Sequence, residues 1–392
     1  MNSPRHTVVI VDAIRTPIGK ARNNGMFASV HPNHLLAQVY QSLFDRTGVD
    51  AGQVGQVLAG CVQQLGPQAS NIARNAWLQA GLPTHVPATS LDFQCGSSQQ
   101  ALHLAASTIA AGTHDCVVAA GVESMSVVPF SAGLRAQEEF GDAFTPEMQH
   151  LYELPARANL SGQGAAAERI ADKWNLSRPQ LDDMAVQSHA RAEDARRKGE
   201  FSREILPIEV KGVAHNDDEG IRPGTSAEKL AGLAPAFGGK LTAATSSQVS
   251  DGAAAVLLMS EQRAAELGLQ PRAIVRDHVV VGDDPHMMLT GPIPATTSIL
   301  KRNSLSVADI GAFEINEAFA SVVGAWMADL EPDPERVNIR GGAMALGHPL
   351  GASGVRLITT LLHIMEDTGA RYGLSTMCCG GGLGTGTLVE LR

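Results

Sequence analysis

Short runs of β-branched and small apolar residues alternate with segments of helical spacing along most of the chain. Continuous apolar runs such as 115–121 and 253–259 predict strands buried on both faces, as in parallel or mixed sheets covered by helices. The expected strands are 7–11, 54–61, one that begins at 88, 115–121, 253–259, 273–281, 312–316, 337–339, 372–378 and 387–391. The expected helices are 35–44, 69–80, 97–111, 165–174, 178–198, 261–267, 294–302 and 355–366. The pattern therefore predicts an α/β fold.

The alternation breaks down between residue 123 and about residue 240, where prolines, methionines and charges interrupt it. Only the helices 165–174 and 178–198 are predicted in this part of the chain, and residues 216–237 are expected to form a loop. We interpret the segment as an insertion that covers the functional site and does not belong to the sheet.

A unit of strand, turn, helix and strand occurs once in each half of the chain, with a similar pattern in both. The first unit surrounds Cys95 and the second surrounds His348. Such a duplication places two strand-to-helix turns face to face at one crevice, where α/β sheets usually bind ligands. The sequence therefore predicts a site to which both turns contribute.

The unit around Cys95 has residues suited to a reactive turn. Gly96 lets the backbone approach a ligand closely, and Ser97 and Ser98 are favoured at a helix start. Because a helix N-terminus is the positive end of the helix dipole, we expect the thiolate of Cys95 to be favoured. A lone cysteine is more often a small buried hydrophobe, so other segments must decide its role.

Composition narrows the classes of function. With 40 glycines, 44% hydrophobic residues and 4% aromatic residues, the chain of 392 residues is typical of an α/β protein with a large core. The net charge of −10 and the lack of a long basic run argue against nucleic acid as a partner. A local basic patch could still bind coenzyme A (CoA) or another phosphate ligand.

Cysteine usage and hydropathy indicate the compartment. Five cysteines without a CxxC pair indicate reduced thiols in the cytoplasm, and neither a disulfide framework nor a zinc or other metal site. Residues 1–6 lead directly into the first expected strand without a signal peptide, and no apolar run is long enough to cross a membrane. We therefore expect a cytoplasmic protein that does not bind a membrane.

Four segments carry the candidate chemistry, each in or beside a turn. They contain Cys95, Asn316, His348 and the pair Cys378 and Cys379. A cysteine, a histidine and a second cysteine in glycine-rich turns suggest a nucleophile, its base and a separate acid/base, with backbone N–H groups available to an oxyanion. Each of these residues alone is more often structural, so the inference depends on their combination.

The motifs 94–97, 316–320, 341–354 and 377–382 together resemble those of the thiolase family, and the likeness covers essentially the whole chain. The resemblance implies the thiolase fold, in which two duplicated βαβαβαββ halves form a five-layer αβαβα arrangement with an inserted loop domain. The expected parts are 1–122 and 249–270 for the N-terminal half, 123–248 for the inserted loop domain, and 271–392 for the C-terminal half.

The same resemblance implies a role for each site residue. Cys95 resembles the nucleophile that becomes acylated, His348 the base that activates it, and Cys378 the acid/base that moves the proton of the acetyl-CoA methyl group. Asn316 resembles the residue that holds a water molecule in one oxyanion hole. The backbone N–H groups of Cys95 and Gly380 resemble the second oxyanion hole.

The resemblance further implies CoA as a co-substrate, no permanently bound cofactor, and a homodimer or homotetramer. The positions that match the family's CoA contacts are Arg222, Ser247, Ala318 and Phe319. Cys379 takes a position that varies in the family, so no role is assigned to it.

The implied activity is CoA-dependent cleavage of a 3-ketoacyl-CoA to acetyl-CoA and a shortened acyl-CoA, with condensation as the reverse reaction. The chain departs from short-chain biosynthetic thiolases at Met288 and Leu289, and its covering loop lacks their basic CoA-binding signature. It looks more like actinobacterial degradative thiolases, including those that act on steroid-derived CoA esters.

Three other functions stay open. The first is a biosynthetic acetoacetyl-CoA thiolase. The second is a decarboxylating condensing enzyme of the ketoacyl synthase type, which would lack the second cysteine that this chain has as Cys378. The third is a thiolase-like protein that binds CoA esters without catalysis, and such relatives typically lose one catalytic element.

Overall fold

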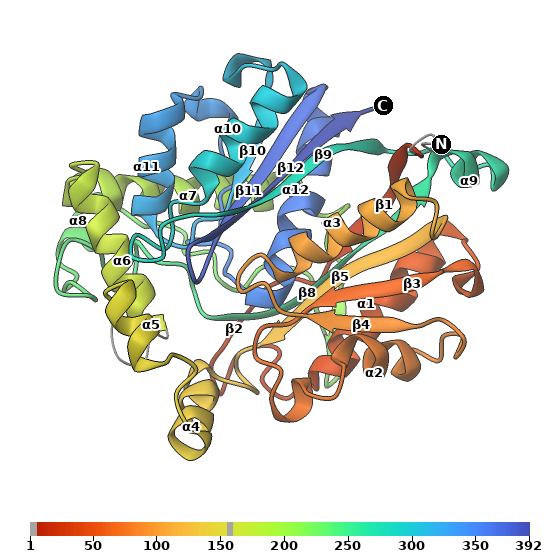
Figure 1. The fold of residues 1–392 in the computed structure, drawn as a ribbon, viewed down its shortest axis with the longest axis horizontal. Helices are drawn as coiled ribbons and strands as arrows, with labels where there is room; N and C mark the ends of the chain where they lie inside the picture. Colours follow the sequence, from red (N-terminus) through yellow and green to blue (C-terminus); the bar gives the residue numbers. More distant parts are fainter. Residues whose placement is uncertain (1–5, 155–159) are drawn as a thin grey trace.

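The computed structural model describes residues 6–154 and 160–392, and the main sheet in these residues has ten strands (Figure 1). Its order is β10-β11-β12-β9-β1-β8-β5-β3-β4, with the short β2 paired to β8. The strands of this sheet are β1 Val8–Arg15, β2 Gly19–Lys20, β3 Gln56–Gly60, β4 Ala88–Leu91, β5 Cys116–Ser124, β8 Ser250–Ser260, β9 Ala273–Gly282, β10 Ala312–Ile315, β11 Tyr372–Cys379 and β12 Leu383–Leu391. A separate hairpin consists of β6 Ile208–Val210 and β7 Val213–His215.

The α-helices are α1 Pro32–Thr47, α2 Ile72–Gln79, α3 Ser97–Ala110, α4 Phe130–Phe140, α5 Pro146–Leu151, α6 Leu160–Lys173, α7 Arg178–Lys198, α8 Ala227–Ala231, α9 Glu261–Glu266, α10 Pro292–Asn303, α11 Ala320–Leu330 and α12 Ser353–Thr368. The pairs β3–β4, β3–β5 and β10–β11 are parallel, whereas β8 and β12 pair antiparallel with their neighbours. The sheet is therefore mixed, as the sequence predicts.

Helices cover the sheet in layers. α1 and α2 pack on the outer face of the first half, and α10 and α11 pack on the outer face of the second half (Figure 1). α3 and α12 lie against each other between the two halves and share one hydrophobic core with strands from both. These contacts give the five-layer αβαβα arrangement that the resemblance implies.

Strand β5 shows how the sequence produces these layers. Val118 and Ala120 belong to the outer core beneath α1 and α2, whereas Val117 and Ala119 belong to the core around α3 and α12. Successive side chains of a strand point to opposite faces, so both faces of β5 meet apolar helices. This burial on both faces explains the continuous apolar run that predicted the strand.

Most of the predicted elements are present, with ends that move by a few residues. The expected helix 178–198 is α7, and its first turn has a capping box formed by Ser177 and Gln180. The first strand is longer than predicted, because β1 continues to Arg15 where a loop is expected.

The expected strand 337–339 is wrong. Val337 makes only an isolated bridge to Phe313, and no ladder follows. The side chain of Asn338 accepts a hydrogen bond from the Ile315 N–H at 2.9 Å and donates one to the Ile315 carbonyl at 3.0 Å. An amide side chain thus takes the place of a backbone pair, which a pattern of apolar residues does not reveal.

The end of the chain also differs from the prediction. The last strand is expected at 387–391, but β12 already begins at Leu383. Gly384 and Gly386 pair with β9 on one side and β11 on the other, so the ladder continues through glycines. The helix α11 is not predicted from the sequence, because its nearly uniform apolar residues show little periodicity.

The segment between β5 and β8 includes α4 to α8, of which α4, α5, α6 and α8 lie along the left and lower side of Figure 1. The hairpin β6–β7 of this segment packs with the outer core of the first half. The segment contains more regular structure than predicted, because α4, α5, α8 and the hairpin β6–β7 lie where loop or irregular structure is expected. Its division from the halves at 122/123, 248/249 and 270/271 stays a prediction. Residues 1–5, part of the predicted lead into the first strand, lie outside the described residues.

A further finding concerns membranes. No helix within residues 6–154 and 160–392 has both the length and the hydrophobicity needed to cross a bilayer.

Candidate active site

Cys95 lies in the turn that joins β4 to α3. The preceding residue, Gln94, has a left-handed backbone with φ of 50°, a conformation that residues other than glycine rarely adopt. The Ser97 side chain holds this turn, because it accepts from the Phe93 N–H at 2.8 Å and donates to the Gln94 carbonyl at 2.6 Å. Gly96 is required there, since a Cβ atom would lie 2.6 Å from the Cys379 sulfur. The backbone thus fixes the Cys95 thiol in place.

Burial dominates the electrostatics of Cys95. It raises the pKa of the thiol to about 12, although the backbone N–H of Gly380 donates to the sulfur and favours the thiolate. The expectation that the helix N-terminus favours the thiolate is therefore outweighed in this structure. The thiol is protonated at neutral pH and requires a base to become a nucleophile.

His348 lies in a buried loop that the end of the inserted segment holds. Its backbone N–H donates to the Gln248 carbonyl at 3.0 Å and to the Ser250 hydroxyl at 3.2 Å. The Ser353 hydroxyl donates to the Pro349 carbonyl at 2.9 Å, so its oxygen accepts from His348 Nδ1, which lies 2.6 Å away. This arrangement assigns the proton to Nδ1 and leaves the lone pair on Nε2.

The Nε2 atom of His348 faces Asn316. Asn316 Nδ2 lies 3.3 Å from His348 Nε2, and Asn316 Oδ1 is buried without a partner among the described residues. Burial, together with the charge of Arg356, lowers the pKa of His348 to about 3. The imidazole is therefore neutral and can accept a proton at Nε2.

The carboxyl ends of two parallel strands bring Asn316 and Cys378 together. The Asn316 N–H donates to the Thr376 carbonyl at 3.0 Å, which continues the register of β10 on β11. Burial and the nearby Cys95 thiol raise the pKa of Cys378 well above its ordinary value. The structure thus places the two sulfurs within electrostatic range of each other.

Cys378 and Cys379 have different surroundings because successive residues of β11 point to opposite faces. Cys378 is buried in the same cluster as Ala318 and Phe319. Cys379 accepts from the Gly96 N–H and contacts Thr385, and burial with the Cys95 thiol raises its pKa as well. The Cys379 sulfur is therefore held by the turn and the sheet, whereas Cys378 lies beside the residues expected to contact CoA.

The starts of α3 and α12 meet at the site. The Val355 N–H donates to the Ser98 hydroxyl at 3.0 Å, and a Cβ atom on Gly354 would lie 2.3 Å from the Gln99 nitrogen. The turn after β4 and the loop that carries His348 thus abut, although the second unit lacks the strand 337–339 that the repeated pattern of the two halves predicts.

Glu123, at the end of β5, fixes the His348 loop to the first half. Its carboxylate accepts from the N–H groups of Val62, Gln63 and Gly351 and from the Gln68 side chain, at 2.9 to 3.0 Å. Burial raises the pKa of Glu123, and these four donors oppose that shift.

A cavity of about 160 Å³ opens beside these groups. It is lined by Met125, Phe130, Gln163, Phe237, Ser246, Ser247, Gln248, Val249, Ala318, Phe319, His348 and Leu350. Cys95 belongs to the same buried cluster as Met125 and Leu350, so the nucleophile candidate borders this cavity. Three of the four expected CoA contacts therefore lie in its wall.

The fourth expected contact, Arg222, lies outside that wall. It is exposed, and its backbone N–H donates to His189 Nδ1 at 3.2 Å. Gly220, two residues before it, accepts from Gln248 in the cavity wall at 3.0 Å. Arg222 is therefore two residues away in the chain from a residue that contacts the cavity wall.

The other residues singled out from the sequence, Met288 and Leu289, are buried in the cluster that contains Cys378 and Phe319. They form part of the packing behind the site. Met288 has φ of 59° and holds a sharp turn in the loop before α10.

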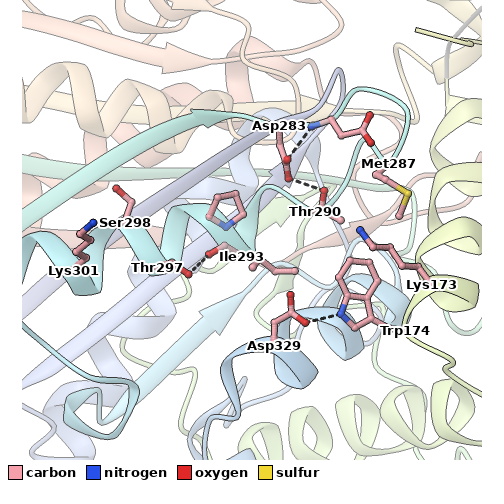
Figure 2. A pocket seen from close by; sticks show the side chains of 12 residues that line it. Lys173, Trp174, Asp283, Met287, Thr290, Ile293, Thr297, Ser298, Lys301 and Asp329 are labelled. Atoms are coloured by element: carbon pink, nitrogen blue, oxygen red, sulfur yellow. Dashed lines mark hydrogen bonds between the residues drawn. The ribbon is translucent and has the colours of Figure 1, made fainter.

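A second cavity, of about 530 Å³, lies between α6, α10, α11 and the loop after β9. Figure 2 shows Trp174 donating to Asp329 at 2.7 Å and Thr290 donating to Asp283 at 2.7 Å. None of the predicted site residues lines it. Its size alone does not connect it to the chemistry of the thiols.

Sequence reasoning did not find Ser353, Glu123 or Glu317. Glu317 accepts from the Ser188 hydroxyl at 2.6 Å and from the Met344 N–H at 3.0 Å, which fastens the loop before His348 to α7. Glu123 and Glu317 could have been recognised from the sequence, because each is an acidic residue in or just after an apolar strand. A carboxylate in such a place is buried and needs hydrogen-bond donors to compensate its charge. In the described parts of the chain, no three His, Cys, Asp or Glu side chains gather as a metal site requires.

Comparisons with known proteins identify the family. The model of the thiolase N-terminal domain matches residues 8–262, and that of the thiolase C-terminal domain matches residues 269–391. The chain is 47% identical to a protein named steroid 3-ketoacyl-CoA thiolase FadA6 from Mycobacterium tuberculosis, over 97% of this chain and 93% of that protein. It is 45% identical to a 3-ketoacyl-CoA thiolase from Pectobacterium carotovorum, over 98% of this chain and 99% of that protein.

A solved structure supports the same family assignment. The crystal structure of the Bacillus anthracis acetyl-CoA acetyltransferase superposes with a TM-score of 0.91 at 36% identity and covers 100% of both chains. The thiolase fold is thereby confirmed, and with it the expectation of an acyltransferase. The chain belongs to the thiolase family.

Proposed function

We propose that this thiolase cleaves a 3-ketoacyl-CoA with CoA to give acetyl-CoA and a shortened acyl-CoA, through an acyl group on Cys95. The observation that carries the proposal is that three groups lie in or beside the wall of one cavity. They are a thiol that needs a base, a neutral imidazole whose Nε2 lone pair faces the Asn316 amide, and a second thiol. CoA is a co-substrate in this reaction, and no resident cofactor is needed.

In the first half-reaction, His348 Nε2 takes the proton of Cys95, and the thiolate attacks the 3-keto carbon. The bond between C2 and C3 then breaks, and its electron pair forms the enolate of acetyl-CoA. Cys378 donates a proton to C2, which gives acetyl-CoA and leaves the acyl group on Cys95. The N–H groups of Cys95 and Gly380, which lie within hydrogen-bond range of the Cys95 sulfur, stabilise the oxygen on the attacked carbon in this proposal.

The enolate oxygen needs its own donors, and His348 and Asn316 are suited to supply them. Once Nε2 carries a proton it becomes a donor, and the amide of Asn316 beside it can hold a water molecule. In the second half-reaction, the CoA thiol passes its proton to the Cys378 thiolate and attacks the acyl carbon. Cys95 leaves as a thiolate and recovers its proton from His348.

The substrate we propose is degradative: a fatty acid or steroid-derived 3-ketoacyl-CoA. The similarity to proteins named 3-ketoacyl-CoA thiolase, one of them a steroid thiolase, supports this choice. An acetoacetyl-CoA thiolase is the alternative, which the likeness to the acetyl-CoA acetyltransferase structure keeps open. Thiolysis rates for linear and ring-bearing 3-ketoacyl-CoA esters against acetoacetyl-CoA decide between the two.

The test of the mechanism compares cysteine variants. We expect Cys95→Ala to abolish thiolysis and Cys378→Ala to lower kcat by about 100-fold or more, because each removes a group that moves a proton or forms a bond. Cys379→Ala should keep most of the activity. Cys116→Ala serves as the control, because Cys116 is buried in the outer core. Retention of an acyl adduct by Cys95→Ala, or wild-type inactivity toward all esters, would contradict the proposal.

We further propose the cytoplasm as the compartment and at least a dimer as the assembly. All five cysteines are free in the structure, which supports a reducing compartment. Strand β4 ends the sheet, and such an edge can pair with a second copy. Light scattering at micromolar concentration should therefore give at least twice the chain mass of 41.1 kDa.

A further inference from the structure

A buried contact between an acid and an arginine joins β10 to α12. Arg356 Nη1 donates to Glu314 Oε2 at 3.3 Å, and the side chains of Arg356 and Glu314 are 1% and 0% exposed. Glu314 lies on β10 and Arg356 on α12, two elements that pack against each other. The contact therefore fixes the helix relative to the strand. The reaction proposed above uses neither side chain.

Each of these two residues is close in its own element to a residue of the site. Glu314 precedes Asn316 by two positions, and side chains two apart in a strand lie on the same face. Arg356 follows Ser353 by three positions, so these two side chains share a face of α12. His348 lies between the other ends, with Nδ1 2.6 Å from the Ser353 hydroxyl and Nε2 3.3 Å from Asn316 Nδ2. Three side-chain contacts and two short stretches of backbone thus form a closed cycle.

Few other contacts hold the members of this cycle. Among the residues that the structure describes, His348 is the only side-chain partner of the Asn316 amide, because Oδ1 has none. In the same part of the chain, Glu314 Oε1 and the Nε and Nη2 atoms of Arg356 have no hydrogen-bond partner. The position of the Asn316 amide relative to the imidazole therefore depends on how β10 and α12 are joined.

The contact does not depend on the protonation state of the acid. Burial raises the pKa of Glu314 to about 8; the charges of Glu204 and Glu317 add to this rise, and those of Arg356 and Arg340 oppose it. A protonated carboxyl group keeps a carbonyl oxygen, which accepts from the guanidinium as a carboxylate oxygen does. The strand and the helix are therefore joined in both states.

We propose that the contact between Glu314 and Arg356 positions the Asn316 amide and the His348 imidazole at the spacing that stabilises the enolate oxygen. The inference rests on the proposed function and deepens it, because it names two positioning residues that touch no reacting atom. Reacting groups must be held closely in place, since a displacement of about 1 Å costs on the order of 100-fold in rate.

The first variant replaces both partners, as Glu314→Leu/Arg356→Met. Removal of one partner of a buried pair is strongly destabilising, whereas two apolar residues of similar volume often keep the stability of the fold. We expect this double variant to fold, as its melting temperature will show. Its acetyl-enzyme should take up deuterium from D2O into the methyl group of acetyl-CoA about 10- to 100-fold more slowly than the wild type, because this exchange passes through the enolate.

A second rate separates positioning from general damage. Alkylation of Cys95 by iodoacetamide requires a thiolate, and hence His348, but no enolate. Burial, then the charge of Arg356, lowers the pKa of His348, so the loss of that charge does not weaken the imidazole as a base. The double variant should therefore alkylate Cys95 at least as fast as the wild type, measured by mass spectrometry of the peptide. An equal fall in exchange and alkylation would overturn the proposal.

Single conservative variants test the contact itself. Glu314→Gln keeps an oxygen that accepts from Arg356 and should retain most of the exchange rate. Arg356→Lys keeps the charge but loses the planar fork, and should slow exchange without slowing alkylation. Exchange in Glu314→Gln as slow as in the double variant would contradict the proposal, because the contact is retained there.

The matched control is Arg302→Met/Asp277→Leu. This pair also joins an arginine on a helix, α10, to an acid on a strand, β9, at 2.7 Å, and it contacts none of the site residues. Both rates should stay at the wild-type level. The wild-type exchange rate in Glu314→Leu/Arg356→Met, or an equal loss in the control, would overturn the proposal.

The wild type separates this inference from the proposed function. A wild type that neither cleaves 3-ketoacyl-CoA esters nor exchanges the methyl protons of acetyl-CoA would refute the function and the inference with it. A wild type that does both, beside a double variant with unchanged exchange, would refute the inference alone.

Discussion

At the scale of single residues, the site depends on keeping two groups uncharged until substrate binds. Burial keeps the Cys95 thiol protonated and the His348 imidazole neutral, and Ser353 fixes which nitrogen of the ring carries the proton. In the proposed mechanism, a proton transfer between them creates a thiolate and an imidazolium together. The Gly380 N–H, which donates to the Cys95 sulfur, and Asn316, which lies beside His348, are the groups proposed to stabilise the charges that follow.

The first prediction at this scale concerns pH. An ordinary imidazole would gain a proton, and the rate would fall, as the pH drops through about 6.5. Because the pKa of His348 is lowered to about 3 and that of Cys95 is raised to about 12, we expect kcat/KM for the 3-ketoacyl-CoA to stay nearly constant from about pH 5.5 to about pH 8.5. The measurement is a pH–rate profile, and an acid limb centred near 6.5 would contradict the prediction.

The second prediction concerns Ser353. Ser353→Ala should lower kcat/KM by about 10- to 100-fold, because the ring would lose the acceptor that keeps its proton on Nδ1. Ser353→Thr should restore much of the activity, which a purely structural role would not explain. Ser260→Ala, which removes the cap of α9, is the control and should change stability but not kcat/KM.

At the scale of elements, the site is a junction of helix starts and strand ends. Glu123 at the end of β5 ties the loop after β3 to the loop that carries His348, so an acid in the first half positions the base of the second. Glu123 acts on the site in two ways, because it positions the His348 loop and because its charge adds to the raised pKa of Cys95.

The prediction at this scale is made for Glu123→Gln. A carboxylate accepts all four hydrogen bonds, whereas an amide would turn an N–H group toward two of the same donors. We expect the unfolding free energy to fall by about 2 to 4 kcal/mol and kcat to fall with it. Urea unfolding and steady-state rates measure both, and the exposed Glu139→Gln is the control. Unaltered stability would show that the network is not needed.

Helices and strands could be predicted from the sequence where their apolar residues follow a regular pattern or their ends carry capping residues. Strand β5 and helix α7 follow from their patterns because β5 is buried on both faces and α7 has caps that mark its ends. The missing strand at 337–339 and the early start of β12 were not predictable, since an asparagine side chain and paired glycines decide them. Helix α11 was not predicted because its first seven residues are all buried and show no alternation of polar and apolar faces.

At the scale of the whole molecule, the sequence predicts which residues form the candidate site but not their protonation states. Cys95, Asn316, His348 and Cys378 could be named from motifs. In the structure, Asn316 lies beside His348 in the cavity wall, and the two cysteines are buried within electrostatic range of each other, in clusters that include other wall residues. What the sequence could not provide is the state of these groups. Burial reverses the expected preference for a thiolate at Cys95, and burial depends on contacts between distant segments.

The Ser98–Val355 hydrogen bond joins the two parts of the polypeptide that carry the proposed reacting groups. Cys95 belongs to the part before β9, and His348 and the second sulfur belong to the part after it. If the backbone were cut just before β9, one fragment would contain Cys95, the proposed acyl acceptor, and the other would contain His348, the proposed base. Turnover would then require the two fragments to reassemble through the contact between Ser98 and Val355.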